Sequence, residues 1–191
     1  MTALLKDIAT IRTGYPFRKG IEKVSGGQYR VVQIKDLDQF AVSSFDSFVQ
    51  TNLPDVGLDH LVCEGDVLFG SRGERRRAAV ATGFLPNTIF PSQIFACSTG
   101  GKVLPGYLAW YINQRPAQKY LDENAGGTNV RIVTLDAFTR LPIPIPPLDL
   151  QRNIAGVYQL SLRERQLIDE INRKRTQFIE QSLLQSIHKY H

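Results

Sequence analysis

Apolar residues in the first 140 positions come in short runs that glycine, proline and acidic residues interrupt, a pattern typical of strands and short helices. Three runs are rich in β-branched and aromatic residues and predict strands at Tyr29–Ile34, Leu61–Phe69 and Ile89–Ser98. A turn at 64–66 interrupts the second run, and Pro91 places the start of the third at a sheet edge or a bulge. A short helix or turn at Leu4–Ala9 precedes them.

Helical spacing of apolar residues begins at Leu104-Pro105, where proline is tolerated in a first turn, and Pro116 should split or kink this helix. Three short features are expected after it: a loop at 125–128, a strand at Val130–Val133, and a turn of helix that Thr134 caps and that runs through Phe138. With the strands, these elements predict a mixed α+β domain.

A proline-rich segment at 141–147 marks the clearest boundary, because its four prolines exclude both helix and central strand. From Asp149 to about Ile187 the sequence has no proline and only one glycine, Gly156, and its pattern is helical. Such a helix would be about 55 to 60 Å long, more than the width of a domain of this size. We therefore expect a folded domain at 1–147 and a long helix for assembly at 148–191.

Apolar residues recur every eleven positions along this helix, as in Val157, Ile168 and Ile179, which keeps them on one side of a nearly straight rod. Ser161, Glu164 and Arg175 interrupt the alternative heptad registers. An amphipathic rod of this kind favours packing against a partner helix over a solvated tail. The residues expected to make that contact are Ile154, Val157, Leu160, Leu167, Ile168, Ile171, Phe178, Ile179 and Leu183.

The bulk composition changes this picture little. The net charge is +5, from 23 basic and 18 acidic residues, which permits a polyanionic partner without requiring one. Fifteen of the basic residues are arginine, whose planar guanidinium suits phosphate and guanine edges.

No apolar run is long enough to cross a bilayer and no secretory leader is evident, so a cytoplasmic protein with no membrane contact is expected. Cys63 and Cys97 both lie in apolar neighbourhoods and are expected to be reduced core thiols.

Sequence patterns for catalysis are missing. There is no GxxxxGK[ST], HExxH or GxSxG motif, and His60, the only histidine away from the C-terminus, is best explained as a surface turn residue. Asp36 and Asp38 leave open a metal-dependent nuclease as a minor alternative. We otherwise expect no catalytic residue, no metal and no cofactor.

Four polar segments are candidates for binding a nucleic acid. The strongest is 70–77, where four arginines follow an apolar strand and can face phosphates or a groove, although a solvated charge run is the competing interpretation. The segments at 126–131, 14–19 and 33–38 are weaker and are equally well explained as turns. The candidate residues are Arg18, Lys19, Lys35, Ser71, Arg72, Glu74, Arg75, Arg76, Arg77, Thr128, Asn129 and Arg131.

Taken in order, several segments resemble the target recognition domain and conserved helix of type I restriction-modification specificity subunits. They are Leu5–Ala9 with Gly14, Gly65–Gly73, Gly126–Thr128, the proline-rich segment with Leu148, and Gln151–Ala155. The chain has Leu150 at a position where the family often has glutamate. The resemblance implies an α+β fold with a twisted, mostly antiparallel sheet. It also implies sequence-specific binding of double-stranded DNA, with catalysis left to separate methyltransferase and restriction subunits.

The chain departs from the usual architecture of such subunits, which hold two recognition domains and two helices. No second copy of the Gly65–Leu68 segment or of the Pro-Pro-Leu segment is present. We therefore expect a half subunit, either a natural one or a fragment of a longer chain. A natural half subunit would form a homodimer through antiparallel helices and favour an interrupted palindrome. A scaffolding protein that uses a coiled-coil helix is the alternative from another functional class.

Overall fold

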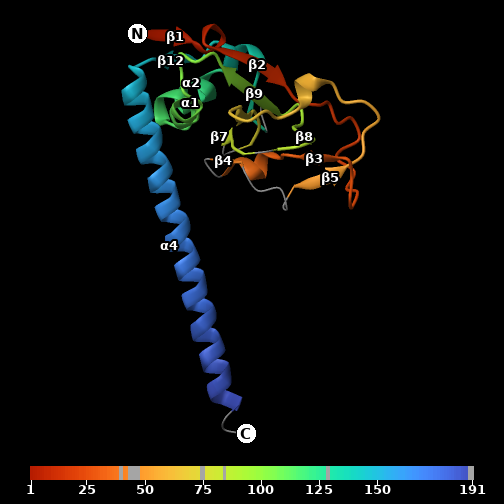
Figure 1. Cartoon of the computed structure of the whole chain (residues 1–191), viewed down its shortest axis with the longest axis vertical. Coiled ribbons are helices and arrows are strands. Elements are labelled where there is room, and N and C mark those ends of the chain that lie inside the picture. Colours follow the sequence, from red (N-terminus) through yellow and green to blue (C-terminus); the bar gives the residue numbers. More distant parts are fainter. Residues whose placement is uncertain (39–40, 43–47, 74–75, 84, 128–129, 189–191) are drawn as a thin grey trace. The chain divides into compact units, whose positions relative to one another are not determined.

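The structure is a computed structural model that describes residues 1–38, 41–42, 48–73, 76–83, 85–127 and 130–188. It divides into two units, Met1–Ala155 and Gly156–His191. The first combines sheets and short helices, and the second continues a single long helix (Figure 1). The predicted α+β class is therefore confirmed.

The first unit is built on a five-stranded sheet with the order β2-β9-β6-β7-β4. Neighbouring strands are antiparallel except for the parallel pair of β4 and β7. Every residue of β6 and β7 is buried, because both faces of the sheet are covered. The strands are β2 (Ala9–Thr13), β9 (Ile94–Thr99), β6 (Val67–Gly70), β7 (Ala78–Ala81) and β4 (Ala41–Val42).

A second sheet has the order β5-β3-β8, formed by Val49–Thr51, Tyr29–Val31 and Thr88–Ile89. Its β3 ends earlier than the strand predicted to reach Ile34, because the chain turns into the 3-10 helix η2 (Ile34–Asp38). The predicted strand Ile89–Ser98 is also divided: β8 and β9 belong to different sheets, and Pro91 lies between them. A single continuous strand was therefore the wrong prediction at both places.

The turn expected at 64–66 is confirmed, so the strand predicted from Leu61 starts only at Val67. Asp66 explains the turn, since its carboxylate accepts a hydrogen bond from the Cys63 N–H at 2.7 Å and another from the Ser98 hydroxyl at 2.6 Å. Arg12 pairs with the same carboxylate at 2.5 Å. Cys97 is buried as expected, but Cys63 is exposed, which corrects its assignment to the core.

Two short antiparallel pairs complete the first unit. The opening strand β1 (Thr2–Leu4) pairs with β12 (Pro142–Pro144) in the proline-rich segment, and β10 (Ala125–Gly126) pairs with β11 (Ile132–Val133). Proline is tolerated in β12 because this strand lies in a two-stranded pair, at an edge. The opening turn is the 3-10 helix η1 (Leu5–Asp7), and a further 3-10 turn, η3, spans Leu58–His60.

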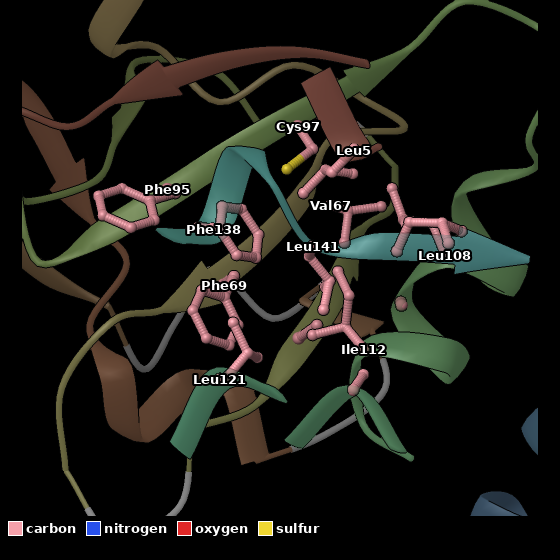
Figure 2. Packing of buried hydrophobic residues seen from close by; sticks show 14 of the residues in the cluster. Leu5, Val67, Phe69, Phe95, Cys97, Leu108, Ile112, Leu121, Phe138 and Leu141 are labelled. Atoms are coloured by element: carbon pink, nitrogen blue, oxygen red, sulfur yellow. The ribbon is translucent and has the colours of Figure 1, made fainter. Parts of the chain in front are cut away.

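Hydrophobic residues form two clusters, one on each face of the central sheet. Alternation along β6 places Val67 and Phe69 in the first cluster and Leu68 in the second. Three helices contribute to the first cluster, in which Phe69 stacks on Phe138 with ring centroids 4.5 Å apart (Figure 2). These helices are α1 (Pro105–Ile112), α2 (Arg115–Glu123) and α3 (Leu135–Thr139).

Two predictions for these helices are confirmed. Pro116 lies in the first turn of α2, where it separates this helix from α1. Thr134 caps α3, and its hydroxyl accepts a hydrogen bond from the Ala137 N–H at 3.2 Å.

The long helix α4 spans Leu148–His188, as predicted from its pattern. Its first two turns belong to the first unit: Gln151 is fully buried, and Ile154 packs against the first hydrophobic cluster. The assignment of Ile154 to a partner helix is therefore corrected. Further along, Val157, Leu160 and the other predicted contact residues are exposed. Within the described residues, no helix combines the length and apolar character that a membrane span requires.

Candidate nucleic-acid interface

The arginine-rich loop connects β6 to β7 and is held firmly at its first residue. Ser71 is buried, and both its N–H and its hydroxyl donate to the Gln93 carbonyl at 2.9 Å. The side chain that was predicted to contact DNA therefore fixes the base of the loop. Arg72, the next residue, is exposed.

The structure brings this loop together with Ile132 and Val133, which directly follow the candidate segment at 126–131. Arg72 forms an isolated antiparallel bridge with Ile132, and the Val133 N–H donates to the Ser71 carbonyl at 2.9 Å. Arg131, which precedes the bridge, is exposed. Two cationic segments that are distant in the sequence therefore lie next to each other.

Asp122, near the end of α2, connects both segments. Its carboxylate pairs with the guanidinium of Arg76, and its backbone carbonyl accepts a hydrogen bond from Arg131 at 3.1 Å. Burial lowers the pKa of the Arg76 guanidinium, and the positive charge of Arg131 lowers it further. Arginine nevertheless stays protonated in proteins, so the Asp122 carboxylate provides the buried Arg76 guanidinium with a counter-charge.

Arg76 differs from the other predicted binding residues. Only 6% of its side chain is exposed, whereas Arg72 and Arg77 on either side of it are exposed. A guanidinium in this position has little surface to offer to DNA. We therefore reassign Arg76 to the support of the loop.

Asn113 fixes the other end of the loop, where β7 begins. Its side-chain amide donates to the Ala78 carbonyl and accepts from the Ala78 N–H, both at 2.8 Å. Sequence reasoning missed Asn113 and Asp122, because nothing in the pattern of α1 or α2 distinguishes them from ordinary residues near helix ends. It missed Gln93 as well, whose contribution is a backbone carbonyl.

Glycine allows close backbone approaches in two of the candidate segments. A Cβ on Gly127 would lie 2.4 Å from the Val130 carbonyl oxygen, and its φ of +101° also disfavours a side chain. A Cβ on Gly14 would lie 2.2 Å from the Phe90 carbonyl oxygen. Both glycines are therefore needed for the backbone geometry of these segments.

The segment at 14–19 lies beside residues 90–92, which directly precede Gln93, the residue whose carbonyl holds the arginine-rich loop. The Tyr15 N–H donates to the Phe90 carbonyl at 2.7 Å, and the Ser92 N–H donates to the Tyr15 carbonyl at 2.9 Å. Arg18 and Lys19 follow and are exposed. The ring of His60 lies against that of Tyr15, with centroids 5.6 Å apart; His60 is partly exposed and its Nδ1 lies 3.2 Å from the Thr13 carbonyl, in agreement with a surface turn.

Lys35 is exposed on η2, which packs against β6 and β7. In the same helix the Asp36 carboxylate accepts a hydrogen bond from the Gln33 N–H at 2.8 Å, so it caps the turn. No group of three or more His, Cys, Asp or Glu side chains suited to a metal ion occurs in the parts of the chain that the structure covers. The nuclease alternative thus gains no support from Asp36, and the side chain of Asp38 is not described.

Four of the predicted binding residues lie outside the described residues: Glu74, Arg75, Thr128 and Asn129. Their proposed contacts remain predictions from sequence. Among the described candidates, the exposed cations are Arg18, Lys19, Lys35, Arg72, Arg77 and Arg131.

Comparison with known proteins identifies the family to which the chain belongs. The family model for the type I restriction modification DNA specificity domain matches residues 1–173. The chain is therefore a member of the type I restriction-modification DNA specificity family. No curated protein matches it.

Solved structures share the fold at low sequence identity. The HsdS subunit from Thermoanaerobacter tengcongensis has a TM-score of 0.59 and 17% identity over 86% of this chain and 37% of its own. A second solved structure, from work on complex assembly and conformational transition of the type I R-M system, has a TM-score of 0.63 and 17% identity over 86% of this chain and 38% of its own. The S subunit of the type I restriction-modification system from M. genitalium has a TM-score of 0.56 and 14% identity over 91% of this chain and 42% of its own. The chain thus spans about two fifths of the length of these proteins.

Proposed function

We propose that this chain reads one half of an interrupted DNA target and leaves catalysis to other subunits. Membership of the DNA specificity family supports the first part of the proposal. The observation that carries it further is the joining of two cationic segments, through the Val133–Ser71 hydrogen bond and through Asp122. We call the exposed guanidinium groups of Arg72, Arg77 and Arg131 the reading surface.

The reading surface suits DNA because guanidinium groups bind phosphate oxygens and the edge of guanine. Its support is rigid: Ser71, Arg76 and Asn113 all take part in hydrogen bonds or ion pairs with other elements. A loop whose ends are already fixed loses less backbone entropy when it binds, which favours affinity. Glu74, Arg75, Thr128 and Asn129 are proposed to add contacts from the adjoining positions, and Arg18, Lys19 and Lys35 to contact phosphates.

The assembly proposed around this reader has two parts. The α4 helix pairs with the helix of a second copy, which restores two recognition domains with two-fold symmetry, and it docks the methyltransferase subunit. A restriction subunit joins through the same complex. The exposed apolar residues of α4 beyond Gly156 support this proposal, since water does not favour such a surface on an isolated helix.

A salt titration of DNA binding tests the reading surface. The wild-type chain and the variants R72A, R77A and R131A are titrated with a labelled random-sequence duplex at several salt concentrations. Phosphate contacts release counterions, so affinity should fall steeply with salt, and losing a phosphate contact should reduce the logarithmic slope by about 1. R140A is the control, because Arg140 is exposed but already paired with Asp136 on α3.

A triple variant R72A/R77A/R131A that binds like the wild type would contradict the reading surface and favour the scaffolding alternative. Incubation of the chain alone with DNA and Mg²⁺ tests the absence of catalysis in the same samples. Cleavage of the duplex would contradict a purely reading role.

A further inference from the structure

Two opposite charges interrupt the apolar face of α4. Exposed apolar side chains line this face in the second unit, with exposed fractions from 42% at Leu167 to 72% at Leu160. We call it the apolar stripe, and it consists of Val157, Leu160, Leu167, Ile168, Ile171, Phe178 and Ile179. Glu164 and Arg175 lie within it, and they are eleven positions apart, the same period as the stripe itself.

Glu164 has no ion partner on its own helix. The residues three and four positions away, which are the ones that face a helical side chain, are Leu160, Ser161, Leu167 and Ile168. None of these residues carries a charge. Glu164 forms no ion pair with any other residue in the described part of the chain.

Arg175 has the same kind of surroundings. Its neighbours at those distances are Ile171, Asn172, Phe178 and Ile179, and it too has no ion pair among the described residues. Glu170 and Lys174 provide the contrast, because this pair bonds along the helix at 2.8 Å. Glu164 and Arg175 have no such partner at these spacings; Arg163 and Glu180 share this property, but they lie outside the apolar stripe.

From this pattern we propose that two copies of α4 pair in an antiparallel register in which Glu164 faces Arg175 of the partner subunit. The two-fold axis passes between Asp169 and Glu170, so the ion pair occurs twice. The proposal rests on the homodimer proposed above and adds the register of its antiparallel helices. The second copy is the occupant because a surface with one acid and one base placed symmetrically is complementary to itself.

The same register pairs four residues of the stripe with apolar residues, whereas Leu167, Phe178 and Val157 face Asn172, Ser161 and Ser182 of the partner subunit. Ile168 faces Ile171 of the partner subunit next to the axis, and Leu160 faces Ile179 of the partner subunit further out, because these residues are equally distant from the axis along the sequence. Shifting the register by two residues on each helix would instead place Arg175 against Ile168 and Glu164 against Ile179. An unpaired charge against an apolar side chain loses hydration without compensation.

A parallel arrangement is disfavoured by the same two residues. It would place Glu164 against Glu164 and Arg175 against Arg175, and like charges in contact across two helices are destabilising. The charges therefore select the antiparallel orientation as well as the register.

Charge reversal tests the register through the dissociation constant of the homodimer, measured by sedimentation equilibrium of the full chain. E164R and R175E each place two like-charged pairs in the interface, so each should weaken the dimer by about tenfold or more. The double variant E164R/R175E exchanges the two charges and should restore wild-type affinity. An equimolar mixture of the two single variants should form a heterodimer, because all of its cross-pairs are again opposite in charge.

E170R is the matched control, since it makes the same change of charge on the same helix outside the apolar stripe. Its dimer should be within about twofold of the wild type, because an exposed pair such as Glu170–Lys174 contributes little. Far-UV circular dichroism confirms that each variant keeps its helix content.

The outcomes separate the register from the homodimer itself. A wild-type chain that stays monomeric at micromolar concentrations would overturn both proposals. A stable dimer in which E164R and R175E behave like E170R would overturn the register and leave the homodimer standing. Failure of the double variant to recover would also count against the register.

Discussion

Arg76 and Asp122 form an ion pair that joins the β6–β7 loop to the end of α2, and Arg131 donates to the backbone carbonyl of the same Asp122. One acidic residue therefore positions two cationic segments that are far apart in the sequence. Arg72 and Arg77, close to Arg76 in the sequence, are exposed.

Replacing Asp122 by Asn should destabilise the first unit and weaken DNA binding. It leaves the Arg76 guanidinium buried without its counter-charge, and we expect a loss of about 1 to 2 kcal/mol in the free energy of unfolding, because Asp122 itself is half exposed. Urea denaturation measures it. The control is E123Q, which removes the exposed pair with Lys119 and should cost less than about 0.5 kcal/mol. Equal stability of the two variants would show that the Arg76–Asp122 pair has no structural role.

Gln151 is a second buried polar residue whose loss should be costly. Its amide accepts from the Leu104 N–H at 2.9 Å and donates to the Lys102 and Pro146 carbonyls at 3.2 and 2.9 Å. Q151A should lower the free energy of unfolding by about 2 to 3 kcal/mol, since it leaves buried backbone groups unpaired. Q159A changes an exposed glutamine of the same helix and should stay within about 0.5 kcal/mol of the wild type.

The first unit should fold without the rest of α4, provided that the helix is cut after Ala155. Residues 1–155 keep Gln151 and Ile154 in place, whereas 1–147 loses both. We expect 1–155 to be a folded monomer that unfolds cooperatively. The fragment 1–147 should unfold at a lower urea concentration. A midpoint for 1–147 equal to that of 1–155 would show that the first turns of α4 add nothing to the domain.

The two cysteines should differ in reactivity towards a thiol reagent. Burial raises the pKa of the Cys97 thiol, and the negative charge of Asp66 raises it further, so at mildly alkaline pH the reactive thiolate of Cys97 is scarce. Cys63 is exposed. A colorimetric titration should count one thiol per native chain and two in concentrated guanidinium chloride. Two rapidly reacting thiols in the native chain would contradict the packing of Cys97 in the core.

Local signals explain what the sequence predicted well. The period of its apolar residues predicted α4, Pro116 predicted the break between α1 and α2, and Thr134 predicted the cap of α3. Each of these features depends only on residues close to it in the sequence. In contrast, β7 was missed because three of its four residues are alanine, which has a low preference for strands. Its position between β6 and β4 creates the strand.

The candidate site was predictable only as a set of segments. The arginines of 70–77 and the segment at 126–131 were recognised, but their contact depends on non-local pairing between Arg72 and Ile132. Burial separated Arg76 from its neighbours, and no spacing rule distinguishes it from Arg77. The supporting role of Asp122 likewise required the packed structure.

Selection of bound sequences from a random duplex pool, with the full chain, tests the central claim most directly. Two identical readers held by paired helices should enrich a palindrome of two half-sites separated by a spacer of fixed length. R72A/R77A/R131A should lose the enrichment. Recovery of a pool with no enriched sequence, from a chain that is folded and dimeric, would contradict the claim that it reads DNA.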